Sequence, residues 1–417
     1  MTERKILHID MNNCYASITT LHHPKLRGKP LAIGGDVEAR HGIILAKNYE
    51  AKPFGIQVGM AIWEAKQKCP GLIVVPPEYD KYLRFSQMMR EIISEYSDQI
   101  EPFGLDELWT DVTGSLSLFA DSAEKLANDI RERIKFELGV TVSIGASYNK
   151  IFAKLGSDIK KPDAVTPIWE DNFKDVVWKL PAEDILGVGR ATKIKLYQRN
   201  VRTIGAIAQT DPKTLQSWFG KWGLILYAFA NGHDTSPVQK MGNESVIKSV
   251  GNSTTTPRDL ENEHDCKIVF YNLAESVARR LRDLGLKGNT VQISLRDNGL
   301  SSFERQMKLD RPTFLANEIC DTAMTLLKTN YTFQKPLRSI GVRAQNLVPE
   351  NQVYQLSLFT EDEEKRNKRE VLERTIDSIR DRFGYYSIDT ALMREDKTLG
   401  RLNCGESNII HPIGYFS

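Results

Sequence analysis

Three carboxylates, at two distant places in the chain, are of the type that metal-dependent chemistry needs. Asp10 ends a β-branched run that begins at Ile6, and Asp106 and Glu107 stand side by side before the run 108–112. Pressed together, they would repel one another and raise their pKa values unless cations neutralised them. Oxygen-rich sites without His or Cys suit Mg²⁺ or Mn²⁺, and two such ions about 3.5–4 Å apart clamp in-line displacement at phosphorus. The alternative is that each is an ordinary strand-end or turn residue, which is commoner for a single carboxylate.

Two groups of polar residues could contact a triphosphate. Tyr49 and Lys52 place a phenol and an ammonium in the segment 48–55, after a strand-like run. A second, basic group follows the last strand of the region and consists of Lys150, Lys154, Lys160 and Lys161. Lys154 and Lys161 could meet the same phosphates from the other side, although charged helix faces are usually only solvated. Neither group is specific by itself.

The segment 180–192 predicts a helix–hairpin–helix. Gly187 and Gly189 let the backbone approach a ligand closely, and the helix that follows offers free N–H groups to an anion. Such hairpins grip nucleic-acid phosphates without reading the base sequence. Because Arg190 and Lys193 add positive charge here, DNA binding is favoured over a plain helical turn.

The first 165 residues alternate strand-like and helix-like stretches. The predicted order is a strand at 6–10, an insertion at about 12–77, a helix at 79–97, strands at 99–103 and 107–112, a helix at 116–138 and a strand at 140–148. This is a ferredoxin-like βαββαβ plan. Its third strand runs antiparallel between the first two, so Asp10 should lie beside Asp106 and Glu107.

The rest of the chain predicts a multidomain α+β protein. Residues 166–236 are mainly helical, 237–243 have the composition of a linker, and 244–347 form another α/β unit. In that unit we expect helices near 267–285 and 313–329 and strands at 290–296, 303–309 and 337–347. The tail, 348–417, contains a strongly charged helix candidate at 361–383 and a weakly patterned end.

Composition excludes several classes of protein. The 417 residues are 41% hydrophobic and 26% charged, as in soluble globular proteins. No window approaches 18 uninterrupted apolar residues, so we expect no membrane span, and the first residues lack the pattern of a secretory signal. The five cysteines are scattered and form no Cys-x-x-Cys pair. We therefore expect a cytoplasmic protein without disulfides or a zinc site.

Charge is distributed unevenly along the chain. The total is only +2, but residues 145–243 carry a net charge of +5 and residues 244–347 of +3, whereas both flanking segments are at −3. A basic middle suits a polyanion gripped by that part of the chain. A chance fluctuation of surface charge is the alternative.

Four motifs together resemble those of the Y-family translesion DNA polymerases, the group that includes bacterial polymerase IV and the UmuC-like polymerases. The motifs are Ile9–Tyr15, Asn48–Lys52, Leu105–Glu107 and Ala153–Asp163. The resemblance runs from about residue 5 to 347. It implies a palm at 1–165 with fingers inserted at about 12–77, a thumb at 166–236 and a little finger at 244–347.

Carried over by position, the resemblance implies a role for each matching residue. Asp10, Asp106 and Glu107 are similar to the ligands of two Mg²⁺ ions, with the Met11 carbonyl assisting. Tyr15 resembles the aromatic steric gate that excludes a ribose 2′-OH. The other residues similar to nucleotide contacts are Cys14, Tyr49, Lys52 and Lys161. The residues of the predicted hairpin expected to contact DNA are Gly187, Gly189, Arg190 and Lys193.

Four positions depart from the family's usual pattern. Gly104 stands where Ser is usual before the Asp-Glu pair, and Asn12 replaces a frequent second Asp. Lys52 replaces the usual Arg and gives up bidentate phosphate geometry, and Cys14 stands where an aromatic residue is common. None of these changes removes a metal ligand, so activity should survive.

A pentapeptide after the last predicted domain resembles the motif that binds the bacterial sliding clamp. It consists of Gln355, Leu356, Ser357, Leu358 and Phe359. An extended segment with two apolar anchors and a polar first residue suits a hydrophobic groove. The alternative is a surface strand or a staple for a helix.

The function that these features favour is template-directed DNA synthesis opposite damaged bases, with low fidelity and within the SOS response. The expected partners are primer–template DNA, dNTPs and the sliding clamp, and the protein is expected to be a monomer. One alternative is a non-catalytic DNA-binding or clamp-associated accessory subunit. A weaker one is a two-metal nuclease, which is disfavoured because the phosphate contacts fit an incoming triphosphate.

Overall fold

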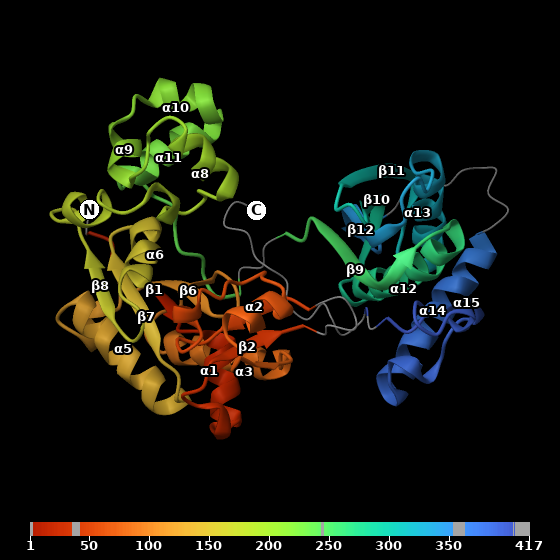
Figure 1. Ribbon diagram of the computed structural model, residues 1–417, viewed down its shortest axis with the longest axis horizontal. Coiled ribbons are helices and arrows are strands. Elements are labelled where there is room, and N and C mark those ends of the chain that lie inside the picture. Colours follow the sequence, from red (N-terminus) through yellow and green to blue (C-terminus); the bar gives the residue numbers. More distant parts are fainter. Residues whose placement is uncertain (1–2, 36–41, 243–245, 353–362, 403, 405–417) are drawn as a thin grey trace. The chain divides into compact units, whose positions relative to one another are not determined.

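The structure is a computed structural model that describes residues 3–35, 42–242, 246–352, 363–402 and 404. By their contacts, these residues form two compact units, the first built mainly from residues up to 242 and the second from residues after 245. Figure 1 shows the units coloured along the sequence. In the part of the chain that the structure describes, no helix combines the length and apolar character that crossing a bilayer requires.

The first unit is built on a five-stranded sheet of order β5-β6-β1-β7-β8. Its strands are β1 (Ile6–Met11), β5 (Ile100–Pro102), β6 (Glu107–Asp111), β7 (Val142–Ser147) and β8 (Val165–Ile168). Neighbouring strands are antiparallel except β7 and β8, which are parallel. The predicted order is confirmed, because β6 lies between β1 and β5. The sheet continues through β8, beyond the boundary expected at residue 165.

Helices α3 (Tyr79–Ser94) and α5 (Ala123–Leu138) pack on one face of this sheet and share its main core. The prediction of a single helix over 116–138 is wrong, because the chain forms a short helix α4 (Leu116–Phe119) before α5. Ser122 separates the two helices. Its side chain accepts a hydrogen bond from the backbone N–H of Lys125 (3.2 Å) and so caps α5.

The opposite face carries the alternate side chains of β1, including His8 and Asp10. Helix α6 (Lys150–Ile159) packs against this side, next to β7. The approach is close enough to require glycine, because a Cβ on Gly145 would lie 1.8 Å from the carbonyl oxygen of Ala153. Residues on α6 are thereby held beside the ends of the central strands.

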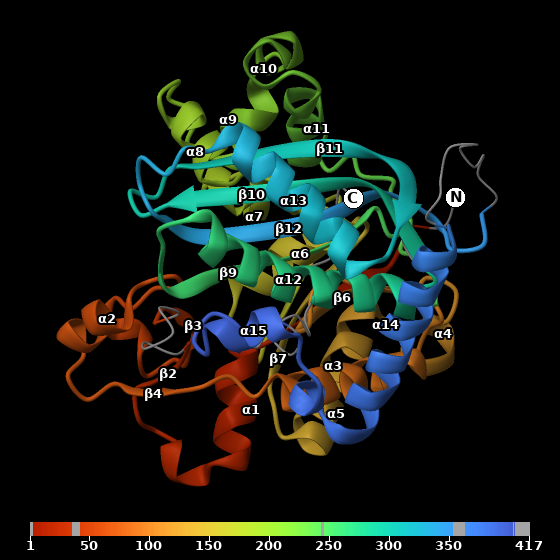
Figure 2. The ribbon, with the colours of Figure 1, turned by 90° about the vertical axis from the view of Figure 1, so that its right-hand side faces the viewer.

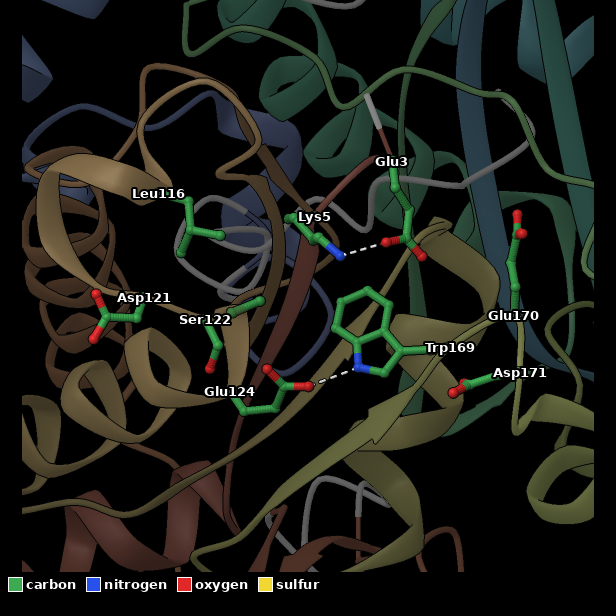
Figure 3. A pocket seen from close by; sticks show the side chains of 10 residues that line it. Glu3, Lys5, Leu116, Asp121, Ser122, Glu124, Trp169, Glu170 and Asp171 are labelled. Atoms are coloured by element: carbon green, nitrogen blue, oxygen red, sulfur yellow. Dashed lines mark hydrogen bonds and ion pairs between the residues drawn. The ribbon is translucent and has the colours of Figure 1, made fainter. Parts of the chain in front are cut away.

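Trp169, directly after β8, ties the edge of the sheet to the start of α5. Its indole N–H donates to Glu124 (2.7 Å), and the Lys5 ammonium lies 4.1 Å from its ring centroid. Figure 3 shows these side chains in a pocket of about 390 Å³, and half of the residues that line it carry carboxylates. Because Lys5 precedes β1 and Asp10 lies near the end of that strand, this pocket is at the opposite end of β1 from the predicted site.

The insertion between β1 and α3 contains a three-stranded sheet of order β3-β2-β4. Its elements are α1 (Cys14–His22), η1 (Pro24–Leu26), β2 (Leu31–Gly34), β3 (Ile44–Lys47), η2 (Lys52–Phe54), α2 (Ile62–Lys68) and β4 (Ile73–Val75). The small sheet and α2 have a core of their own, which includes Ile44 and Ile62. Helix α1 packs instead on the main core of the unit, through Ile18.

Helices follow β8. They are α7 (Phe173–Val177), η3 (Ala182–Asp184), α8 (Arg190–Tyr197), α9 (Ile204–Gln209), α10 (Pro212–Phe219) and α11 (Lys221–Ala230). They enclose a separate apolar core that contains Leu196, Leu215 and Leu226.

The segment with linker composition, 237–243, lies against the five-stranded sheet over its described part. Val238 is buried and packs in a small cluster with Trp109. The backbone N–H of Gln239 donates to Glu101 (3.0 Å). These residues therefore form part of the first unit.

The second unit contains a four-stranded antiparallel sheet of order β11-β10-β12-β9. Its strands are β9 (Ser249–Leu260), β10 (Leu286–Asp297), β11 (Ser302–Thr313) and β12 (Leu337–Pro349). Helices α12 (Glu263–Asp283) and α13 (Ala316–Asn330) lie side by side on the sheet, as Figure 2 shows. The helices and three of the strands follow the prediction, which lacked β9.

The tail folds back onto the second unit. It contains α14 (Glu363–Phe383), η4 (Tyr385–Ser387) and α15 (Ala391–Glu395), so the charged helix was correctly predicted. Arg282 of α12 is buried between two carboxylates of α14, Glu373 and Asp377, with an Nε–Oδ2 distance of 2.6 Å to the latter. Leu399 and Cys404 are buried in the core of the unit. The pentapeptide 355–359 lies outside the described residues.

Replacing Arg282 by Ala should loosen the tail, because Glu373 and Asp377 would be left without their cation. Breaking a buried ion pair in this way costs about 3–5 kcal/mol. We expect hydrogen exchange in the full-length chain to show at least a hundredfold loss of protection in α14. Lys368→Ala is the control, because Lys368 pairs with Glu364 where both side chains are largely exposed. Equal effects of the two substitutions would contradict the prediction.

Candidate active site

Asp10 and Glu107 lie directly opposite each other, on the neighbouring strands β1 and β6. Asp106 precedes Glu107, and its carbonyl accepts a hydrogen bond from the backbone N–H of Met11 (2.8 Å). The predicted juxtaposition of these three carboxylates at one edge of the sheet is confirmed. It follows from the order of the strands, because the end of β1 meets the beginning of β6.

The carboxylates are poorly solvated. Burial raises the pKa of Asp10 to about 6, even though Lys161 acts in the opposite direction. Burial, and then the charge of Glu107, also raise the pKa of Asp106. The site therefore favours the arrival of positive charge, since a cation would stabilise the ionised forms.

Two lysines supply positive charge in this structure. The Lys161 ammonium lies 2.9 Å from Asp10 and 2.8 Å from Asp158, and Lys154 pairs with Glu107. Burial by itself would lower the pKa of Lys161, but the two aspartates outweigh it and raise the pKa. Both lysines thus pair with the carboxylates in this structure, whereas the sequence analysis expected them at the phosphates of a nucleotide, and that contact stays a prediction.

The other two lysines of the basic group do not reach the carboxylates. Lys150 is buried, and its ammonium lies 2.7 Å from the Glu101 carboxylate. Lys160 is exposed at the end of α6. Spacing alone could not distinguish these residues, because the direction of each side chain depends on how α6 packs.

His8 belongs to the site but was not singled out from the sequence. Its Nδ1 lies 2.8 Å from the Ser157 hydroxyl, and its Nε2 lies 3.3 Å from Glu107. Burial is the main reason why the pKa of His8 is well below its usual value, so the imidazole is neutral. Its position two residues before Asp10, and so on the same face of β1, is the sequence signal that could have found it.

Tyr15 is held by other aromatic rings near the start of α1. Its ring stacks on Tyr82 of α3, with centroids 4.3 Å apart and planes at 7°. Tyr79 packs edge-on against both rings. Tyr82 is itself fixed, because its hydroxyl lies 3.0 Å from that of Thr19. Tyr15 therefore has a rigid backing.

Cys14 differs from its neighbour Tyr15 in its surroundings, although the sequence analysis expected both residues to contact the nucleotide. Its side chain is 4% exposed and packs in the main core. Burial raises the pKa of its thiol far above the usual value. The structure thus gives Cys14 a packing role, and its expected contact with a nucleotide stays a prediction.

Tyr49 and Lys52 lie in the turn after β3, with the Lys52 ammonium 4.3 Å from the centroid of the Tyr49 ring. The side chain of Asn48 holds this turn by accepting the backbone N–H groups of Leu31 (2.9 Å) and Ala51 (3.1 Å). Burial raises the pKa of Tyr49, and the charges of Lys161 and Asp10 also act on it. The two residues therefore face the same region as the carboxylates.

Two of the departures from the family pattern have structural explanations. Asn12 is buried, and its amide donates to Ser143 (3.0 Å) and accepts the backbone N–H of Asp163 (2.9 Å). It thus ties the segment after Lys161 to the end of β1. Gly104 has φ of +114°, a backbone conformation that a serine side chain would rarely adopt.

The predicted helix–hairpin–helix is present between η3 and α8. Gly187 has φ of +89°, and a Cβ there would lie 2.2 Å from a ring carbon of Trp222, so both the turn and the packing require glycine. Gly189 directly precedes α8, and Arg190 is exposed at its first position. Lys193 pairs with Glu183 (2.7 Å), so part of its charge is already engaged.

The oxygen donors of these carboxylates suit a hard divalent cation. In this structure, however, lysines pair with two of the three carboxylates. Among the described residues, no three Asp, Glu, His or Cys side chains lie close enough together to hold a metal ion. Asp10 and Glu107 are paired with lysines instead. The donors of the site are nonetheless oxygens, and two of the three carboxyl groups have raised pKa values, so a hard cation suits them.

Comparison with known proteins assigns this arrangement to a family. Models of the impB/mucB/samB family and of its C-terminal domain match residues 9–158 and 247–358, and a model described as the thumb domain of DNA polymerase iota matches 183–234. A DNA polymerase IV of Acetivibrio thermocellus is 51% identical over 400 residues, which cover 96% of this chain and all of that protein. The chain belongs to the Y-family DNA polymerases.

Other relatives and a solved structure agree with this assignment. DNA polymerase IV of Pelotomaculum thermopropionicum is 39% identical, over 92% of this chain and 94% of that protein. DNA polymerase IV 1 of Bacillus subtilis is 35% identical, over 95% and 93%. A Y-family DNA polymerase chimera has the same fold, with a TM-score of 0.73 and 23% identity over 83% of this chain and 99% of that one.

The protein is therefore a DNA-directed DNA polymerase of the translesion type, as the sequence predicted. The alternative of a non-catalytic accessory subunit is not supported. The predicted fold class, with palm, fingers, thumb and little finger, is confirmed. Membership of the family implies that the polymerase binds primer–template DNA and dNTPs and depends on divalent metal ions.

Proposed function

We propose that the polymerase transfers a dNMP from a dNTP to a primer 3′-hydroxyl with two Mg²⁺ ions held by Asp10, Asp106, Glu107 and the Met11 carbonyl. The observation that carries this proposal is the direct opposition of Asp10 and Glu107 in neighbouring strands, next to Asp106. When bound, the ions would activate the attacking hydroxyl and neutralise the leaving pyrophosphate. Mn²⁺ is expected to substitute because it accepts the same oxygen donors.

The lysines of the site would change partners during the catalytic cycle. Lys161 and Lys154 now neutralise Asp10 and Glu107. Metal ions would take over that task, and the two ammonium groups would become available to the phosphates of the nucleotide. Lys52 and Tyr49 would contact the same triphosphate from the fingers, with Lys52 acting as a point charge rather than as a bidentate donor.

Two further surfaces complete the proposal. Tyr15, backed by Tyr82, would close the space that a ribose 2′-hydroxyl needs. In the thumb, the backbone around Gly187 and Gly189 would hold a DNA phosphate at the start of α8, with Arg190 adding charge and Lys193 contributing when it leaves Glu183.

Primer extension by the purified protein tests the metal assignment. We expect dNTP incorporation on a primed template to require Mg²⁺, to persist at a lower fidelity with Mn²⁺, and to be absent with Ca²⁺ or a chelator. Extension on a template with a damaged base, compared with an undamaged one, would show which lesion is bypassed. Incorporation that is independent of added divalent ions would contradict the proposal.

The cellular setting is also part of the proposal. We infer a monomeric polymerase that works in the cytoplasm during the SOS response and is recruited by the sliding clamp through Gln355, Leu356, Ser357, Leu358 and Phe359. The support is the match of the chain to proteins named DNA polymerase IV and the apolar anchors of the pentapeptide. Such anchors gain affinity by entering a hydrophobic groove.

Replacing Leu358 and Phe359 together by Ala should separate recruitment from chemistry. We expect synthesis without the clamp to be unchanged, whereas the stimulation by the clamp should fall about tenfold or more, since two buried apolar anchors contribute about 1.5–3 kcal/mol each. Primer extension with and without purified clamp measures both quantities. Unchanged stimulation in the double variant would show that another surface binds the clamp.

A further inference from the structure

Arg90 of α3 contacts the turn that leads to Asp106, and it is not one of the contacts predicted from the sequence. Its guanidinium donates a hydrogen bond to the backbone carbonyl of Gly104 (3.2 Å). The side chain is partly buried, and burial lowers its pKa. Among the described residues, no carboxylate pairs with this guanidinium. Its one hydrogen bond among the described residues therefore goes to a backbone carbonyl, whereas charges that lose part of their hydration are more often paired with an opposite charge.

The carbonyl that Arg90 contacts belongs to the turn that carries Asp106. This turn connects β5 and β6, and it is closed by a hydrogen bond from the Phe103 N–H to the Glu107 carbonyl (2.9 Å). Gly104 has φ of +114°, so its backbone adopts a conformation that side chains rarely allow. A Cβ built on Gly104 would lie 3.6 Å from a carboxylate oxygen of Asp106, which shows how near the two residues are.

We propose that Arg90 is a positioning residue that holds the Gly104–Asp106 turn, and so fixes the direction of the Asp106 carboxylate. The inference rests on the proposed function, in which Asp106 is a metal ligand. A hydrogen bond from a charged donor to the Gly104 carbonyl restrains a turn that glycine would otherwise leave free to change its backbone dihedrals. Groups that orient a metal ligand typically change metal affinity or activity by about 10- to 100-fold when they are removed.

The surroundings of Arg90 offer a matched control. Arg90 lines a groove of about 500 Å³ along α3 together with Leu83, Arg84 and Gln87. Arg84 is exposed and has the same charge, on the same helix, but it has no hydrogen bond or ion pair within the described part of the chain. If Arg90 acted only through its positive charge near DNA, Arg84→Ala and Arg90→Ala would show the same loss. If Arg90 positions the turn, only Arg90→Ala would show a loss.

The experiment measures metal affinity apart from turnover. Each full-length variant is bound to primer–template DNA with a dideoxy-terminated primer and a correct dNTP, and free Mn²⁺ is followed by electron paramagnetic resonance. We expect Arg90→Ala to bind Mn²⁺ about tenfold more weakly and to lose about 10- to 100-fold in the rate of a single incorporation. Arg84→Ala should match the unmodified enzyme in both, and the affinity of Arg90→Ala for DNA should be unchanged.

One further variant and a chemical rescue keep the inference falsifiable if alanine lowers the thermal stability. Arg90→Gln retains an N–H donor on a shorter, uncharged side chain and should be intermediate, and guanidinium ion should partly restore Arg90→Ala by entering the groove. Unchanged Mn²⁺ affinity in Arg90→Ala and Arg90→Gln would overturn the inference, as would a parallel loss of DNA affinity. The proposed function has a separate test: if Asp106→Asn is inactive while Arg90→Ala behaves as the unmodified enzyme, only the positioning role fails.

Discussion

Asp106→Asn is expected to reduce primer extension by at least about 10³-fold while leaving DNA binding intact. The substitution keeps the size of the side chain but removes a negative charge from a site where two other carboxylates remain. A metal ion at such a site supplies several kcal/mol of stabilisation in the transition state, and each 1.36 kcal/mol is tenfold in rate. Single-nucleotide incorporation under pre-steady-state conditions measures the loss, and fluorescence anisotropy of labelled primer–template measures DNA affinity.

The control for this substitution is Asp121→Asn. Asp121 belongs to the same compact unit, but its side chain is 95% exposed, and its only ion pair among the described residues is with Lys125 on the surface. The Asp121→Asn variant should therefore retain the activity and DNA affinity of the unmodified enzyme. If Asp106→Asn extended primers at a normal rate, the assignment of Asp106 as a metal ligand would be wrong, and with it the two-metal proposal.

Tyr15→Ala is expected to raise the incorporation of ribonucleotides relative to deoxyribonucleotides by about 30-fold. Tyr15 cannot move aside easily, because its ring stacks on the buried Tyr82 and meets the edge of Tyr79. A 2′-hydroxyl forced against a ring held in this way costs about 2 kcal/mol, in the range found for overpacked sites. Alanine removes the ring, so this penalty should disappear, and the incorporation of ribonucleotides should rise more than that of deoxyribonucleotides.

The ratio of kcat/KM for dNTP and rNTP measures this effect on one template. Phe136→Ala is the control, since Phe136 is 90% exposed on α5 and should leave the ratio unchanged. Tyr82→Phe offers a second comparison, because it keeps the stacked ring and loses only the contact with Thr19. An unchanged ratio in Tyr15→Ala would show that discrimination against ribose lies elsewhere in the site.

The order of strands and helices in the first unit could largely be predicted, because the pattern of apolar residues that indicates each element lies within a short segment. Alternation of apolar residues in β1 and the helical stripes of α3 and α5 are properties of short segments, and they gave the order of the sheet. That order in turn placed Asp10 beside Glu107. The break between α4 and α5 was missed because Ser122 decides it through a single capping hydrogen bond, which the helical periodicity of the segment conceals.

The site itself could be predicted only in part. Asp10, Asp106, Glu107 and Lys161 stand out by residue type, and the structure brings them together or beside one another. His8, Tyr82 and Arg90 do not stand out, because His, Tyr and Arg occur in many structural positions and only packing shows what they touch. Cys14 was predicted to contact the nucleotide together with Tyr15, yet successive residues of a helix point in different directions, and the Cys14 side chain is buried in the core.

The sequence by itself determined which carboxylates, lysines and glycines are available and in what order of strands and helices they occur. Only the tertiary structure decided which of four neighbouring lysines reach the acidic groups, which side of β1 faces α6, and that the linker and the tail pack against their units. The reason is physical: periodicity reports burial along one element, whereas the partner of a charge depends on side-chain direction and on the approach of elements distant in sequence. The contact of Val238 with Trp109, and that of Arg282 with Glu373 and Asp377, are decided at that level.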